Sequence, residues 1–172
     1  EEVIVDDYYV GYKWVKDNTP KDSRIMAWWD YGYQIAGIAN RTSLADGNTW
    51  NLEHIALLGK ILTAPQKHAH DLAKHLADYV LVWAGGGGDD LAKMPHLARI
   101  SSSVFDGICP GDPICRNYGF DSRSNATPHP QVKQSLIFNL VMHNRHRDAH
   151  LDEKLFKEVY SSKYGLIRVF KI

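Results

Sequence analysis

Four short stretches of the chain have the residue pattern of β-strands. Residues 24–29 and 42–45 are apolar-rich runs, and each is followed by aspartate and glycine, which favour a turn. Residues 79–83 are a continuous apolar run of strand length, which is typical of a strand buried on both faces. Residues 166–170 form a last run after Gly165. The pattern therefore predicts a sheet with residues 79–83 at its centre.

Three other segments repeat apolar residues at the spacing of an α-helix. Residues 51–62 form the first, and the second begins near Pro65. The third follows Asp152, a residue type that caps helix N-termini, and extends over residues 155–160. The apolar positions behind these predictions are Leu52, Ile55, Ala56, Gly59 and Leu62; Ala69, Leu72, Ala73 and Leu76; and Leu155, Phe156, Val159 and Tyr160.

Strands and helices alternate over most of the chain in this prediction. Such alternation is typical of α/β domains, in which helices pack against a mostly parallel sheet. We therefore expect an α/β fold with a mixed, mostly parallel sheet flanked by helices, in one globular domain over residues 1–172. Residues 106–130 are rich in Gly, Pro, Ser and Asn, which predicts a long loop.

The charge balance argues against several kinds of partner. Lys and Arg number 20, and Asp and Glu number 20, so the formal net charge is zero. A nucleic-acid-binding domain needs surplus basic charge, so no nucleic-acid partner is expected. No stretch approaches the about 20 consecutive apolar residues of a membrane helix. Because Glu1 is not an initiator residue, we expect the chain to be a piece of a longer protein, whose other parts are free to span a membrane.

Two cysteines, Cys109 and Cys115, lie in the predicted loop. Two prolines and a glycine between them favour a chain reversal that brings the sulfur atoms together. In an oxidising compartment this arrangement predicts a disulfide, whereas in the cytosol the two cysteines would be free thiols. A zinc site is less favoured, because it needs four ligands and the chain has no second cysteine pair.

The most informative polar chemistry lies where the first predicted strand ends, in the run Trp28-Trp29-Asp30-Tyr31-Gly32. In α/β sheets, ligands bind at the carboxyl ends of the strands. Each indole offers one N–H donor beside a broad apolar face, and a carboxylate offers only acceptors. With a turn at its end, the run is suited to gripping a small hydroxyl away from water. The alternative is that the tryptophans are core residues whose N–H groups meet backbone carbonyls.

The pentapeptide matches the WWDYG signature of oligosaccharyltransferase catalytic subunits. Further segments resemble the eukaryotic form of that family in the same order, namely residues 33–37, 39–42, 48–51, 54–56, 78–82 and 163–166. The resemblance covers most of residues 22–83, a stretch near residues 89–100, and the C-terminal strand. Residues 93–96 and the cysteine loop resemble single-subunit protozoan forms.

A second element resembles the family's Asp-x-x-Lys-x-x-x-Met/Ile motif. Asp90, Lys93 and Leu97 are spaced i, i+3 and i+7, which predicts one stripe of a helix. Asp89 or Asp90 can cap that helix, and Pro95 should kink or restart it. Leu97 stands where the family has Met or Ile. Without the resemblance, Asp90 and Lys93 are better interpreted as a solvated surface pair.

The resemblance implies a transferase of N-linked glycosylation, which moves a lipid-linked oligosaccharide onto the Asn of an Asn-X-Ser/Thr acceptor polypeptide. Trp28, Trp29 and Asp30 are then expected to bind the hydroxyl of the +2 Ser or Thr, since a site built around a hydroxyl rejects analogues without one. Tyr31 and Gly32 are expected to shape the turn.

In the same family the Asp-x-x-Lys stripe lies beside WWDYG and helps to hold the acceptor, so Asp90, Lys93 and Leu97 are expected to bind substrate, with Leu97 against a threonine methyl. No catalytic residue and no metal or cofactor site is expected in this chain. The family's divalent metal, Mn or Mg, and the lipid-linked donor belong to membrane segments outside it. The implied location is the endoplasmic reticulum membrane, with this domain in the lumen and inactive by itself.

Two further patterns offer different functions. Residues 85–88 are four glycines after a buried strand, which would suit a soluble α/β module that binds a nucleotide or small ligand. The loop lacks the Lys-Ser/Thr of a P-loop and runs into acidic residues, which repel phosphate. His143, His146 and His150 have the spacing of one helical face and are a possible zinc site. A solvated, polar helix end is the favoured interpretation of that set.

Overall fold

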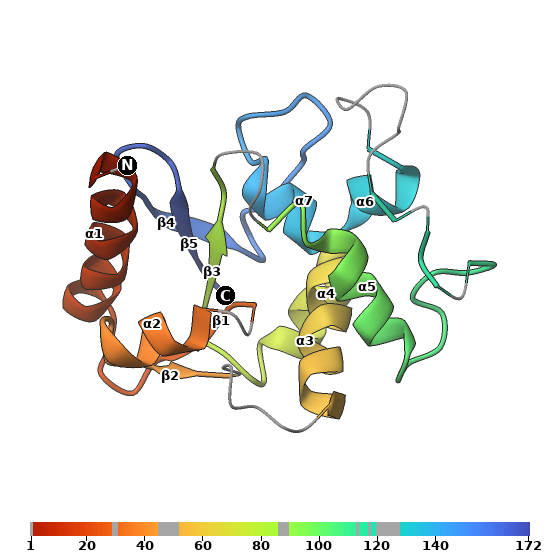
Figure 1. Cartoon of the computed structure of the whole chain (residues 1–172), viewed down its shortest axis with the longest axis horizontal. Coiled ribbons are helices and arrows are strands. Elements are labelled where there is room, and N and C mark those ends of the chain that lie inside the picture. Colours follow the sequence, from red (N-terminus) through yellow and green to blue (C-terminus); the bar gives the residue numbers. More distant parts are fainter. Residues whose placement is uncertain are drawn as a thin grey trace.

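A computed structural model gives the fold of the chain (Figure 1). It describes residues 2–28, 31–44, 52–85, 90–112, 114–116, 118–119 and 128–172. The helices and strands in chain order are α1 (Glu2–Asn18), β1 (Arg24–Met26), α2 (Gly32–Gly37), β2 (Thr42–Ser43), α3 (Leu52–Thr63), α4 (Gln66–Ala73), β3 (Tyr79–Trp83), α5 (Met94–Ser102), α6 (Pro130–Gln134), α7 (Leu136–Val141), β4 (Lys157–Ser161) and β5 (Ile167–Lys171).

The described strands form one mixed sheet in the order β2-β1-β3-β5-β4. Strand β1 pairs in parallel with β2 and with β3, whereas β5 pairs antiparallel with β3 and with β4. Strand β3 is central, as its apolar run predicts, and Val80, Leu81 and Val82 are all buried. The α/β class and the mixed sheet are thereby confirmed, although parallel pairing is confined to the β2-β1-β3 side.

The helix predicted after Asp152 is wrong. Residues 157–161 form the edge strand β4, and the register with β5 shifts between Glu158 and Tyr160. A bulge of this kind inserts one extra residue and breaks the two-residue alternation of a strand. The remaining apolar spacing therefore imitates that of a helix.

Helix α1, for which the sequence pattern gave no prediction, packs against β5. Its Gly11 lies so close to β5 that an added Cβ would stand 3.0 Å from the side chain of Ile167. The buried carboxylate of Asp7 accepts hydrogen bonds from Ser162 Oγ at 2.5 Å and from the backbone N–H of Tyr164 at 3.1 Å. The first helix is therefore tied to the β4–β5 hairpin.

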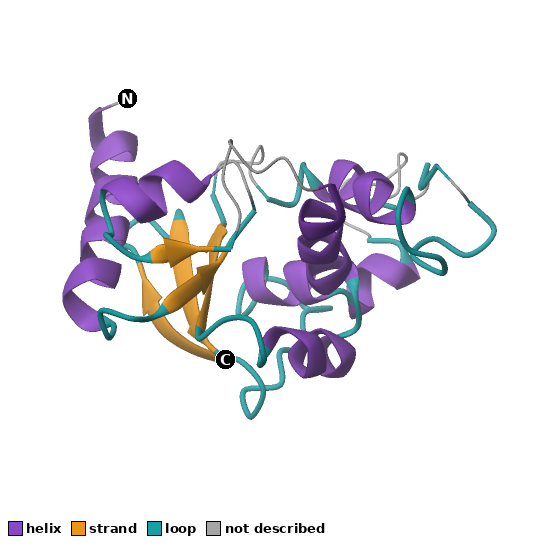
Figure 2. Ribbon diagram, turned by 90° about the horizontal axis from the view of Figure 1, so that it is seen from below, coloured by secondary structure: helices purple, strands orange, loops and turns teal. Residues whose placement is uncertain are grey.

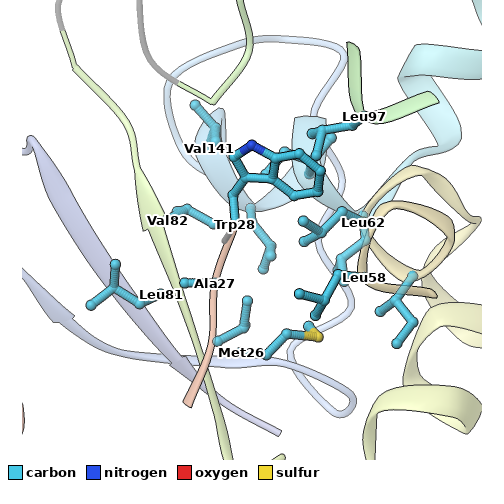
Figure 3. Close-up of a cluster of buried hydrophobic side chains, with 14 of the residues drawn as sticks. Met26, Ala27, Trp28, Leu58, Leu62, Leu81, Val82, Leu97 and Val141 are labelled. Atoms are coloured by element: carbon cyan, nitrogen blue, oxygen red, sulfur yellow. The ribbon is translucent and has the colours of Figure 1, made fainter. Parts of the chain in front are cut away.

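The helices lie on both sides of the sheet. Helix α1 is on one side and α3 to α7 gather on the other (Figures 1 and 2). In the described part of the chain, no helix has the length and apolar character needed to cross a membrane. The main core fills the space between β1, β3 and the helices α3, α5 and α7 (Figure 3).

Helices α3 and α5 approach each other closely at Gly59. A Cβ at this position would stand 2.8 Å from the carbonyl oxygen of Leu97 and 3.3 Å from Cβ of Ser101. The glycine therefore sets how near α5, which bears Leu97, lies to the core.

Replacing Gly59 with alanine is expected to lower the free energy of unfolding by about 1–3 kcal/mol, because the added methyl group meets backbone atoms that cannot rotate away. Gly37→Ala is the matched control, since nothing lies within 4 Å of its added Cβ. That variant should be neutral or up to about 1 kcal/mol more stable, owing to the better helix propensity of alanine. Urea unfolding of the 172-residue chain measures both, and equal midpoints would contradict the packing argument.

Candidate functional site

The pentapeptide follows β1 and leads into α2. Its first and fourth residues, Trp28 and Tyr31, are 2% and 1% exposed. The backbone N–H of Tyr31 donates to the carbonyl of Trp28 at 3.1 Å. That bond brings the backbone of Tyr31 back to Trp28, and Gly32, also buried, starts α2. Trp29 and Asp30 lie outside the described residues. The Trp28 ring lies beside Leu97 in the core (Figure 3), so its burial matches that of a core tryptophan.

The Tyr31 hydroxyl joins the pentapeptide to the second motif. It donates a short hydrogen bond to Oδ1 of Asp90, 59 residues further along the chain. It also accepts a hydrogen bond from Nζ of Lys93 at 2.9 Å. One phenolic oxygen thus bridges a carboxylate and an ammonium group. The two motifs that resemble the family's signatures are therefore in direct contact, and Tyr31 does more than shape a turn.

Asp90 is buried, at 2% exposure. Its Oδ2 accepts the backbone N–H of Trp83 at 2.9 Å, and its own N–H donates to the Trp83 carbonyl at 3.3 Å. A buried carboxylate is stable only when donors surround it. The interpretation of Asp90 and Lys93 as a solvated surface pair is therefore wrong.

The predicted helical stripe is only partly correct. Helix α5 begins at Met94, and Pro95 occupies its first turn, where a missing N–H does no harm. Asp90 and Lys93 lie in the turn before the helix, and Lys93 is the N-cap. Asp90 therefore does not cap α5, because its carboxylate is committed to Tyr31 and Trp83.

Leu97 lies inside α5 and is completely buried. Its backbone N–H donates to the Lys93 carbonyl at 2.9 Å, which fixes the helix onto the turn. Its side chain faces the core beside Trp28 and Leu62 (Figure 3). Contact between Leu97 and a threonine methyl would therefore require a rearrangement at the surface above it.

The sequence analysis gave no role to Trp83, the last residue of β3. Its ring stacks on Tyr31, with centroids 4.1 Å apart and an interplanar angle of 6°. Tyr8 of α1 stacks with the same indole at 4.2 Å. The indole N–H donates to the Tyr12 hydroxyl at 2.7 Å. The position of Trp83 at the carboxyl end of the central strand, where ligands bind in α/β sheets, is the signal that marks it.

The site also has a defined charge pattern. The Lys93 Nζ lies 4.6 Å from the Tyr31 ring centroid and 5.9 Å from that of Trp83, so the ammonium rests against aromatic surface. Burial is the main cause that raises the pKa of Tyr12, and the Trp83 hydrogen bond lowers it only in part. Tyr12 therefore stays neutral at physiological pH. A half-buried ammonium over aromatic rings is suited to binding carbonyl or hydroxyl oxygens of a ligand.

The cysteine prediction is confirmed. Cys109 and Cys115 form a disulfide with their Cα atoms 5.5 Å apart. Both are buried, so the bridge closes the loop after α5 onto the helical side of the core.

The histidine set does not lie on a helix. Helix α7 ends at Val141, and all three residues lie beyond it, His143 in a turn and the other two in irregular structure. His143 is buried and pairs with Glu153 at 3.4 Å, whereas His146 lies 3.8 Å from Asp148. Over the described ranges, no three His, Cys, Asp or Glu side chains gather as a metal site.

The first glycine of the 85–88 run has a packing role. A Cβ on Gly85 would stand 1.9 Å from Cδ2 of Leu166. The other three glycines lie outside the described residues. Close approach to Leu166, the residue before β5, therefore explains Gly85 without a nucleotide.

Comparisons with known proteins agree with this geometry. Residues 21–86 match the family model of the STT3/PglB/AglB core domain. The dolichyl-diphosphooligosaccharide–protein glycosyltransferase subunit stt3 of Schizosaccharomyces pombe is 35% identical over 195 residues, which cover 99% of this chain and 25% of that protein. The chain thus spans about a quarter of the length of that relative.

Solved structures with the same fold include the C-terminal globular domain of an oligosaccharyltransferase from Archaeoglobus fulgidus, with a TM-score of 0.64 at 17% identity over 96% of both chains. An Archaeoglobus fulgidus oligosaccharyltransferase tethered to an acceptor peptide with the NVT sequon also matches, with a TM-score of 0.64 at 14% identity over 91% of this chain and 23% of that one.

The fold is therefore that of the C-terminal globular domain of an oligosaccharyltransferase. The chain belongs to the STT3/PglB/AglB family, and the relationship that the WWDYG run indicated is confirmed.

Replacing Tyr31 with phenylalanine should lower the free energy of unfolding by about 1.5–3 kcal/mol, because the buried Asp90 carboxylate loses a charge-assisted hydrogen bond. Tyr33→Phe, in which the hydroxyl is removed from a side chain that is 52% exposed, is the control and should change it by no more than about 0.5 kcal/mol. Chemical denaturation of the 172-residue chain compares the two. A Tyr31→Phe chain as stable as the control would show that this bond contributes little.

Proposed function

We propose that this chain is the lumen-facing C-terminal domain of an oligosaccharyltransferase catalytic subunit in the endoplasmic reticulum membrane. The parent enzyme transfers a lipid-linked oligosaccharide to Asn in Asn-X-Ser/Thr acceptors. The observation that supports this most strongly is the Tyr31 hydroxyl, which joins the WWDYG run to Asp90 and Lys93. The disulfide of Cys109 and Cys115 suits the oxidising lumen.

In this proposal the domain selects the acceptor. Trp28, Trp29 and Asp30 bind the hydroxyl of the +2 Ser or Thr, with the buried Trp28 reached only when the acceptor displaces the surface above it. Tyr31 and Gly32 set the turn that presents them. An acceptor without that hydroxyl is rejected, because it leaves the polar groups of the site unpaired. Asp90 and Tyr31 fix the ammonium of Lys93 beside the same turn.

In this proposal Leu97 supports the site from the core, since it is buried beside Trp28. A threonine methyl can reach it only when the acceptor displaces the surface above it. Burial of one methyl group contributes at most about 1 kcal/mol, so a preference for Thr over Ser from this source is modest.

The chemical step belongs to the rest of the parent enzyme. We assign the divalent metal, Mn or Mg, and the lipid-linked donor to segments outside this chain. Binding of the acceptor hydroxyl then contributes to catalysis by orienting the asparagine for transfer.

Asp30→Ala in the full-length enzyme is expected to raise the KM for an Asn-X-Thr peptide at least about tenfold, because one buried hydrogen bond to a carboxylate is worth about 1.5–3 kcal/mol. Turnover should also fall if docking orients the asparagine. Asp22→Ala, an exposed carboxylate earlier in the same segment, is the control. Initial rates against peptide concentration measure both, and wild-type kinetics for Asp30→Ala would refute the hydroxyl-reading role.

The isolated 172-residue chain should transfer no glycan when it is given a lipid-linked oligosaccharide, Mn²⁺ and an Asn-X-Thr peptide, because the donor site lies elsewhere in the parent. Mass spectrometry of the peptide measures the transfer, with the full-length enzyme as the positive control. A glycosylated peptide produced by the isolated chain would place the chemistry inside this domain.

A further inference from the structure

Trp83 occupies a place between the first helix and the candidate acceptor site. One face of its indole stacks on Tyr31 and the ring also stacks with Tyr8, at centroid distances of 4.1 and 4.2 Å. The indole N–H donates to the Tyr12 hydroxyl at 2.7 Å. Two residues of α1, Tyr8 and Tyr12, therefore hold the Trp83 ring against Tyr31, the side chain that joins the two motifs.

We infer that Tyr8, Tyr12 and Trp83 act as a bracket of positioning residues, which fixes Tyr31 and Lys93 in the geometry that binds the acceptor peptide. This inference rests on the proposed function. It adds residues that do not belong to either motif and that come from α1 and β3. None of the three needs to touch the peptide.

The bracket fixes the plane of the Tyr31 ring. The hydroxyl must meet Oδ1 of Asp90 and Nζ of Lys93 at once, and a swing of the ring about its Cα–Cβ bond would break both contacts. Stacking on Trp83 blocks that swing on one side. The backbone N–H of Trp83 meets Asp90 as well, so ring and carboxylate are aligned from one residue.

Trp83 itself is fixed by α1. The stacks on Tyr31 and Tyr8 set the plane of its half-buried ring, and a rotation by half a turn about the Cβ–Cγ bond would preserve that plane but turn the indole N–H away. The hydrogen bond from the indole N–H to Tyr12 sets that rotation, and Tyr12 is 1% exposed in the core. The Lys93 ammonium lies near both rings, so a displaced indole would also move its aromatic support.

A second aromatic pair on α1 provides a matched control. Trp14 stacks on Tyr160 of β4 with centroids 4.6 Å apart and an interplanar angle of 14°. This pair joins α1 to the sheet in the same manner, and it lies away from Tyr31. A variant of Trp14 therefore reports what the loss of packing on α1 does to the enzyme without disturbing the bracket.

The test uses the full-length enzyme with an Asn-X-Thr peptide and five variants: Trp83→Leu, Trp83→Phe, Tyr12→Phe, Trp14→Phe and Asp30→Ala. Trp83→Leu removes ring and N–H, and should raise the peptide KM about tenfold. Trp83→Phe retains an aromatic ring but loses the indole N–H, and Tyr12→Phe retains the stack but loses the hydrogen bond to that N–H. Each of these two variants should raise the peptide KM about threefold. The kcat should stay within about twofold in all three, because bound peptide restores the geometry.

Trp14→Phe should leave KM within about twofold of wild type. The bracket is refuted if the Trp83 and Tyr12 variants retain wild-type KM, or if Trp14→Phe raises KM as much as they do. If Trp83→Leu does not fold, Trp83→Phe and Tyr12→Phe decide. Asp30→Ala separates the two hypotheses: an unchanged KM there overturns the proposed function, whereas a raised KM there with unchanged Trp83 and Tyr12 variants overturns the bracket alone.

Discussion

The buried carboxylate of Asp90 is the constraint on which the candidate site depends. A charge removed from water must be surrounded by donors. The backbone of Trp83, seven residues away, supplies one donor, and Tyr31, 59 residues away after β1, supplies another. The loop after β3 is thereby drawn against the turn after β1. The site is thus formed by tertiary contacts, and neither motif builds it from its own local structure.

The same carboxylate determines how Lys93 is used. A lysine near a carboxylate at the surface would form only a weak, solvated ion pair. Here the ammonium also meets the Tyr31 hydroxyl, which already donates to Asp90, and it rests against aromatic rings. Polarisation along such a chain strengthens each bond. The ammonium of Lys93 is thereby held at a defined place beside Tyr31.

The sequence predicted most of the sheet and both motifs, because continuous apolar runs and signature residues are local features. The run 79–83 proved central, and the cysteine pair is bridged. Tyr160 and its neighbours were assigned to a helix because the bulge in β4 removes the alternation of a strand. The contact of Tyr31 with Asp90 spans 59 residues, and no spacing rule within one element could reveal it. The contacts of Trp83 with the site were not predicted, because its sequence context is that of the last residue of an ordinary buried strand.

The carboxylate of Asp7 has a consequence for how the domain is made. It holds Ser162 and the hairpin beyond it, 155 residues later in the chain, and β5 of that hairpin is the only strand that joins β3 to β4 among the described elements. Until residues 167–171 have left the ribosome, β3 has no partner on that side, and Trp83 at its end lacks its paired neighbour Ile167. The sheet described here is therefore complete only after β5 has been synthesised, and the contacts of Asp7 with the β4–β5 hairpin form at that stage.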